Sequence, residues 1–152
     1  MSTLSRFYPR GPVDVSQWLM TLPADGRIPA MPGWQWVHTP GHTRGHVALW
    51  RDSDRTLIAG DAVITTAQES AYSVLTQSPE LHGPPMYYTP DWDNARASVV
   101  RLAALEPETL VTGHGPPLHG PEMREALHAL ARDFDRIAVP RQGRYVAPSR
   151  PR

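Results

Sequence analysis

Three positions in this 152-residue chain pair a glycine with a side chain that can bind a metal ion. They are Gly41-His42, Gly60-Asp61 and Gly113-His114, and each lies at the end of an expected β-strand. Glycine at such a point lets the backbone turn tightly and approach a bound ion. Imidazole and carboxylate groups together suit zinc, manganese or iron. The pattern therefore predicts a metal site built from these three side chains.

The elements that must position them are short apolar strands. The expected strands cover residues 34–37, 46–50, 56–59 and 109–111, and the RDSDR stretch between the second and third indicates a tight hairpin. Neighbouring strand ends would bring the three side chains to one rim of a sheet. The second, third and fourth strands are continuously apolar, which is typical of a sheet covered on both faces.

Two amphipathic helices follow the first three strands. The first is expected to start at Thr89-Pro90-Asp91, with a capping residue before proline, and to end at Pro107. The second is expected to run from Gly120-Pro121 to Pro140 as one helix. Their apolar stripes are Ala95, Val99, Leu102 and Leu105 in the first, and Met123, Leu127, Leu130, Phe134 and Ile137 in the second.

Less regular segments complete the chain. Residues 13–22 are compatible with a short strand or a single helical turn, and residues 68–75 with a helix. We divide the chain into an irregular N-terminal segment (1–33), a structured region (34–139) and a flexible tail (140–152). The two main helices can cover one face of the sheet. The other face would remain an apolar patch, which indicates a missing layer.

Composition narrows the function. The formal net charge is zero, which does not favour nucleic acid or anionic lipid as a partner. The absence of cysteine excludes disulfides, thiolate metal ligands and a cysteine nucleophile. Any metal must then be held by histidine and carboxylate. The N-terminus has no apolar signal region and no stretch is long enough to span a membrane, so we expect a cytoplasmic protein.

Three motifs, in this order, resemble those of the metallo-β-lactamase fold superfamily. Residues 38–46 read HTPGHTRGH, which is similar to the HTPGHTxGH signature; residues 57–61 read LIAGD, and residues 112–115 read TGHG. The resemblance implies an α/β protein of the αββα type. It covers the C-terminal αβ half of that fold, a mixed β-sheet with helices on one face. It also implies a metal-dependent hydrolase that uses zinc, two ions in an intact site, with manganese or iron as alternatives.

The resemblance also implies roles for individual residues. His42 would bind the first metal, Asp61 would bridge both metals, and His114 would bind the second. A single ion held by all three side chains is the alternative. His38 would orient the loop, and His46 would either support the ligands from behind or pack in its strand. No family role matches His82, His119 or His128.

The superfamily's HxHxDH motif, which supplies the other ligands, occurs nowhere in these 152 residues. We therefore expect weak metal binding and little hydrolysis by this chain alone. The first hypothesis is a truncated or split hydrolase, completed by a partner chain that carries HxHxDH. Its metal-activated water would attack an ester, thioester, lactone, phosphodiester or β-lactam bond of a small-molecule substrate. The alternative is a non-catalytic half-domain that acts as an interaction module or homodimer. A third hypothesis, an unrelated α/β protein, fits the three motifs poorly.

Overall fold

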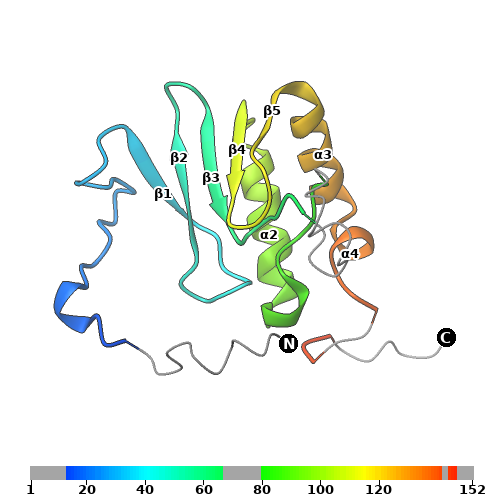
Figure 1. Ribbon diagram of the computed structural model, residues 1–152, viewed down its shortest axis with the longest axis horizontal. Coiled ribbons are helices and arrows are strands. Elements are labelled where there is room, and N and C mark those ends of the chain that lie inside the picture. The colour runs from blue at the N-terminus through cyan, green and yellow to red at the C-terminus, as the bar shows by residue number, and fades with distance from the viewer. Residues whose placement is uncertain (1–12, 67–79, 142–143, 147–152) are drawn as a thin grey trace, which may run out of the picture.

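A computed structural model describes residues 13–66, 80–141 and 144–146 of the chain (Figure 1). It has the expected α/β architecture, and all four expected strands are present within one residue of their expected bounds. The expected helix at 68–75 lies outside the described residues. The elements are η2 (Ser16–Trp18), β1 (Trp34–His38), β2 (Val47–Arg51), β3 (Thr56–Gly60), η3 (Met86–Tyr88), α2 (Trp92–Ala103), β4 (Thr109–Thr112), β5 (Leu118–His119), α3 (Gly120–Arg132) and α4 (Phe134–Ile137).

The strands form one mixed five-stranded sheet in the order β1-β2-β3-β4-β5. The β1–β2, β2–β3 and β4–β5 pairs are antiparallel, whereas β3 and β4 run parallel. In this topology the C-terminal ends of β1, β3 and β4 lie at the same rim of the sheet. Helix α2 makes the crossover from β3 to β4, as parallel pairs require. The short strand β5 is an edge strand that the sequence patterns did not predict.

One face of the sheet packs against α2, α3 and α4 (Figure 1). Leu57 of β3 pairs with Trp50 of β2 and with Leu110 of β4, so these three side chains share that face. All three are buried, and they belong to the same hydrophobic cluster as the helix residues Leu102 and Leu127. The expectation of helices on one face of the sheet is therefore confirmed.

The opposite face of the sheet is apolar but only partly covered. Burial alternates along β2 and β3, so that every second residue is buried and the others remain half-exposed. The pairing register places the half-exposed residues on one surface, the outer face. Its apolar members are Trp34, Trp36, Val47, Leu49, Ile58 and Val111, and Arg51, Thr56 and Thr109 lie on it beside them. Continuously apolar strands in this chain thus coincide with a sheet that its own helices cover on one side only.

Helix α2 begins two residues later than the sequence predicted. Asp91, not Thr89, is the N-cap, and its carboxylate accepts a hydrogen bond from Asn94 N at 3.0 Å. Thr89 precedes a proline, which disfavours helical backbone, and its φ and ψ are −102° and 101°. Its hydroxyl is buried and donates to Pro85 O instead. The helix also ends earlier, at Ala103, so Leu105 packs on the core from the following turn.

The expected single C-terminal helix was wrong, because it is broken into α3 and α4. Asp133 leaves the helical region with φ −109° and ψ 27°, and the amides of Arg136 and Ile137 bond back to its carbonyl to start α4. The apolar stripe nevertheless remains continuous, because Phe134 is buried beyond the break. At the other end of the chain, η2 agrees with a single helical turn in residues 13–22. Several large apolar side chains of that segment are exposed: Val13, Val15, Trp18, Leu19, Met20 and Leu22.

Candidate metal centre

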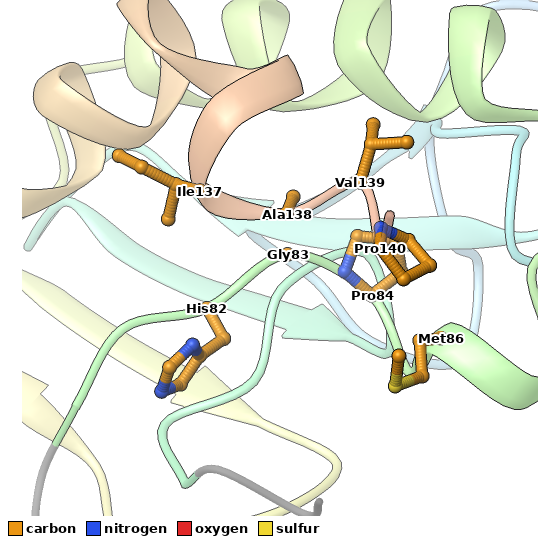
Figure 2. Close-up of a pocket in the computed structure, with 8 residues that line it drawn as sticks. All are labelled: His82, Gly83, Pro84, Met86, Ile137, Ala138, Val139 and Pro140. Carbon is orange, nitrogen blue, oxygen red and sulfur yellow. The ribbon is translucent and has the colours of Figure 1, made fainter. Parts of the chain in front are cut away.

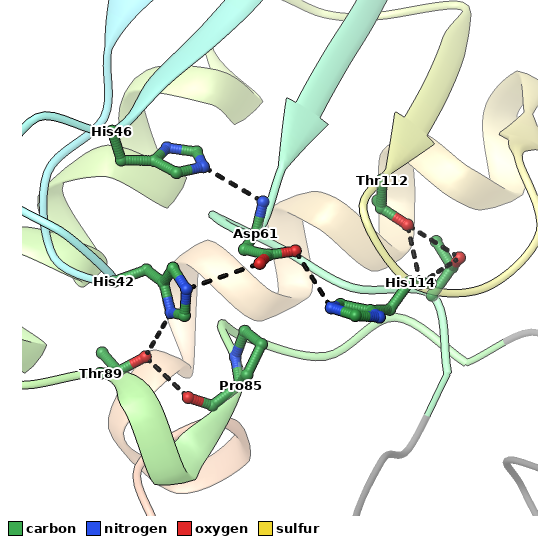
Figure 3. Close-up of polar contacts among 8 residues, drawn as sticks. His42, His46, Asp61, Pro85, Thr89, Thr112 and His114 are labelled. Carbon is green, nitrogen blue, oxygen red and sulfur yellow. Dashed lines mark hydrogen bonds and ion pairs between the residues drawn. The ribbon is translucent and has the colours of Figure 1, made fainter. Parts of the chain in front are cut away.

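The three expected ligands converge at one rim of the sheet (Figure 3). His42 lies in the loop between β1 and β2, Asp61 follows β3, and His114 follows β4. His42 Nε2 is 3.5 Å from Asp61 Oδ2, and His114 Nε2 is 3.5 Å from Asp61 Oδ1. The fractional exposure of the side chains rises from 14% for His42 through 28% for Asp61 to 45% for His114. The cluster is therefore open to solvent on the His114 side.

The two imidazoles face different oxygens of one carboxylate. Among the described residues, no group of three or more histidine, cysteine, aspartate or glutamate side chains is arranged to hold a metal ion. The geometry thus does not form a three-donor pocket for a single ion. Each oxygen of Asp61 instead has its own imidazole neighbour, so His42 with Oδ2 and His114 with Oδ1 are two separate donor pairs, and each pair would need further donors to hold an ion.

Thr89 orients the ring of His42 from the side opposite Asp61. Thr89 is buried and its hydroxyl proton is donated to Pro85 O at 2.8 Å. Its oxygen is therefore an acceptor for the His42 Nδ1–H, 3.4 Å away (Figure 3). With Nδ1 donating to Thr89, Nε2 is the ring nitrogen that faces Asp61 Oδ2. Nε2 and the carboxylate oxygen need a positive charge between them, which either a proton on Nε2 or a bound metal ion supplies.

His46 contacts the main chain of Asp61. The Asp61 N–H donates to His46 Nε2 at 3.1 Å, and His46 Nδ1 is 2.7 Å from Thr39 Oγ1. Burial lowers the pKa of His46, and the neighbouring His42 lowers it further. Both effects favour the neutral ring, which is the form that can accept the Asp61 amide. His46 thus has a hydrogen bond to the main chain of an expected ligand in addition to its place immediately before β2.

His114 is held through its carbonyl group. The amide of Thr65 donates to His114 O at 2.9 Å, and the Thr112 hydroxyl donates to the same oxygen at 2.9 Å. The Thr65 hydroxyl also donates to Pro116 O at 2.6 Å. Thr65 is fully buried. These bonds fix the turn that carries His114, while its ring stays free to face Asp61.

His42 and His114 are thus each contacted by a buried threonine that sequence reasoning did not identify, and a third buried threonine, Thr39, reaches Asp61 through His46. Thr39, Thr65 and Thr89 are all almost completely inaccessible. Thr39 is part of the HTPGH motif and could have been singled out there. Thr65 and Thr89 belong to none of the three motifs, and their roles depend on contacts with residues 47 to 51 positions away.

The remaining histidines have partners outside this cluster. His38 Nε2 contacts Arg44 O at 2.9 Å across the loop. His82 lies beside Glu80, His119 beside Thr109, and His128 beside Glu106. None of these three is a ligand candidate.

A separate small pocket lies between the end of α4 and the segment that precedes η3 (Figure 2). Its volume is about 140 Å³, and the side chains that line it are apolar apart from that of His82. The lining residues are His82, Gly83, Pro84, Met86, Ile137, Ala138, Val139 and Pro140. One imidazole among apolar side chains cannot hold a catalytic metal, so the chemistry remains with the Asp61 cluster.

Sequence comparison identifies the family. The profile described as the metallo-beta-lactamase superfamily matches residues 2–114, most of the chain. The chain belongs to the metallo-β-lactamase superfamily. The match begins well before the HTPGHTRGH motif, so it also includes the segment before β1.

Known relatives are longer than this chain. The probable metallo-hydrolase YflN of Bacillus subtilis (strain 168) is 49% identical over 137 residues, which are 90% of this chain and 52% of YflN. The chain thus spans about half the length of this relative. A second relative from the same organism, the probable metallo-hydrolase YqjP, is 22% identical over 60% of this chain and 27% of its own length.

Among solved structures, TTHA1623 in a di-iron-bound form is 25% identical, with a TM-score of 0.48 over 82% of this chain and 49% of that chain. The family assignment rests on the sequence matches and not on this likeness. In the described parts of the chain, no helix is long and apolar enough to cross a membrane.

Proposed function

We propose that this chain provides the later ligands of a metal-dependent hydrolase site. The observation that carries the proposal is the placement of His42 Nε2 and His114 Nε2 at opposite oxygens of Asp61, each 3.5 Å away. His42 would hold one ion, His114 the other, and Asp61 would bridge them. We propose zinc as the metal, because imidazole and carboxylate donors without cysteine are common zinc ligands.

A bound divalent ion would supply Lewis-acid chemistry, polarising the scissile group and lowering the pKa of water. The protein's own contribution is to hold the donors. Thr89 keeps His42 Nε2 directed at the site, and the threonine contacts to His114 O fix the second turn. The open side near His114 gives a small-molecule substrate access to Asp61. The superfamily acts on esters, thioesters, lactones, phosphodiesters and β-lactams, and we assign no substrate among them.

The proposal includes a partner for the outer face of the sheet. The HxHxDH motif is absent from these 152 residues, and YflN is about twice as long as the matched region. We propose that donors from a partner chain, which would also cover the half-exposed apolar face, complete the site. The exposed apolar side chains of residues 13–22 offer further contact area.

The half-exposed outer face also favours a second candidate, a non-catalytic module or homodimer. Both candidates bury this face, but only the first needs the metal ligands. Zinc titration by calorimetry, with the variants H42Q, D61N and H114Q, separates them. H128Q is the matched control, since the His128 ring bonds to Glu106 and is not part of the Asp61 cluster.

If the first candidate, the hydrolase, is correct, we expect the chain to bind zinc weakly. Each of the three ligand variants should abolish this binding, and H128Q should retain it. We expect no turnover of thioester, lactone or phosphodiester substrates by the chain alone. We expect turnover when the chain is co-expressed with a polypeptide that carries HxHxDH. Zinc binding unaffected by D61N would overturn the ligand assignment. Efficient turnover by the purified chain alone would contradict the proposal that its metal site is incomplete. A stable dimer without zinc binding would favour the second candidate.

A further inference from the structure

We propose that His46 is a positioning residue that holds the main chain of Asp61 and couples it to the loop that carries His42. This inference rests on the proposed function only in taking His42 and Asp61 as ligands. The contact itself is part of the fold. His46 stands four residues after His42 and immediately before β2, whereas Asp61 follows β3. Its ring therefore joins two separate segments of the candidate centre.

The hydrogen bonds define which ring nitrogen of His46 accepts and which donates. An amide N–H can only donate, so His46 Nε2 must accept from Asp61 N, 3.1 Å away. The neutral ring then carries its proton on Nδ1, which donates to Thr39 Oγ1 at 2.7 Å. Thr39 is buried, and its own amide donates to His46 O at 2.9 Å. Thr39 and His46 are thus linked twice, which fixes both the position of the ring and its tautomer.

The backbone around Asp61 is shaped to receive this ring. Gly60 has a φ of +53°, and a Cβ atom at that position would lie 2.8 Å from His46 Nε2. A side chain there would both strain the backbone and displace the imidazole. The amide of Ala62 bonds back to Ala59 O, which closes the turn behind Asp61. The imidazole is thus the partner that satisfies the Asp61 amide within this turn.

The ring of His46 also packs against the ring of His42. Their centroids are 6.2 Å apart and their planes are perpendicular. A shift of His46 would therefore move the ring of one candidate ligand and release the main chain of another. Residues that orient metal ligands from behind typically change metal affinity by roughly 10–100-fold when they are replaced.

The test compares H46Q and H46L in the full chain. The glutamine carboxamide can place an acceptor near the position of Nε2, whereas leucine retains bulk without any acceptor. The first readout is hydrogen exchange of the Asp61 amide by NMR without metal. We expect exchange to be at least tenfold faster in H46L and near the wild-type rate in H46Q. The second readout is the zinc Kd, which we expect to rise roughly 10–100-fold in H46L and to recover in H46Q.

A third variant keeps the proposal testable if H46L does not fold. T39V removes the acceptor for Nδ1–H but leaves His46 in place. We expect the ¹⁵N shifts of His46 to show an Nδ1–H tautomer in the wild type and a mixed population in T39V. Unchanged Asp61 exchange in H46L, or a wild-type Nε2–H tautomer, would overturn the proposal. Failure of every variant and of the wild type to bind zinc would refute the proposed function, while the exchange and tautomer readouts would still decide the role of His46.

Discussion

Gly113 lies so close to Asp61 that a Cβ atom on Gly113 would be 2.2 Å from Asp61 Oδ1. The Gly113 amide also donates to Gly60 O at 3.0 Å, so the ends of β4 and β3 meet at this point. The carboxylate oxygen that faces His114 is therefore in direct contact with the backbone just before His114. A side chain at position 113 would therefore clash with Asp61 in its present position.

The first prediction concerns this contact. We expect G113A to push the Asp61 carboxylate out of place, to destabilise the chain by about 1–3 kcal/mol and to weaken zinc binding. Denaturant unfolding and zinc titration measure the two effects. G45A is the matched control, because a Cβ atom on Gly45 would meet no atom within 4 Å and the φ of Gly45 is not positive. Equal stability and zinc affinity in G113A and G45A would contradict the prediction.

The second prediction concerns the hydroxyl behind His42. T89V leaves both Pro85 O and the His42 Nδ1–H without their partner, at a cost of about 1–3 kcal/mol in stability. We expect the His42 ring to lose its single tautomer, as seen in its ¹⁵N shifts, and T89S to restore it. S98A serves as the control, since the Ser98 hydroxyl donates to Pro40 O without touching the imidazole. A wild-type His42 spectrum in T89V would argue against this role.

The third prediction compares neighbours on opposite faces of β3. Leu57 is fully buried, so L57A should lower the free energy of unfolding by about 2–5 kcal/mol. Ile58 lies on the half-exposed outer face, and I58A should cost only about 1 kcal/mol in the isolated chain. Chemical denaturation of both variants checks the difference. If a partner covers the outer face, the cost of I58A should increase once that partner is bound; equal costs in both states would count against such a cover.

The fourth prediction is a pH dependence of stability. Burial holds the pKa of His46 below the value of 6.5 that it has when unfolded. The unfolded chain therefore binds more protons at this residue as pH falls below 6.5, and the stability contributed by neutral His46 is lost down to its folded pKa. Unfolding free energies measured in EDTA as the pH falls from about 7.5 to about 4.5 should decline less in H46Q than in the wild type. Parallel profiles for the two proteins would show that His46 does not contribute.

Much of the fold could be predicted because it depends on local pattern. Short apolar runs between turn residues predicted the four main strands within a residue of their bounds, and the helical stripes were correct in Val99, Leu102 and Leu127. Helix ends were less predictable. Asp91 rather than Thr89 caps α2, because the Thr89 hydroxyl is buried and donates to Pro85 O. Capping rules based on sequence do not predict this contact. The break at Asp133 had no signal in the apolar stripe, which continues to Phe134.

The sequence by itself determined the candidate ligands, His42, Asp61 and His114, and the family to which the chain belongs. Residue type and motif order suffice for this, because metal-binding chemistry depends on which donors are present. Only the tertiary structure decided how these donors face one another. It placed one imidazole at each oxygen of Asp61, and it assigned Thr89 and His46 to the support of His42 and Asp61. Those relationships depend on angstrom-scale distances between segments far apart in the chain, which residue spacing cannot specify.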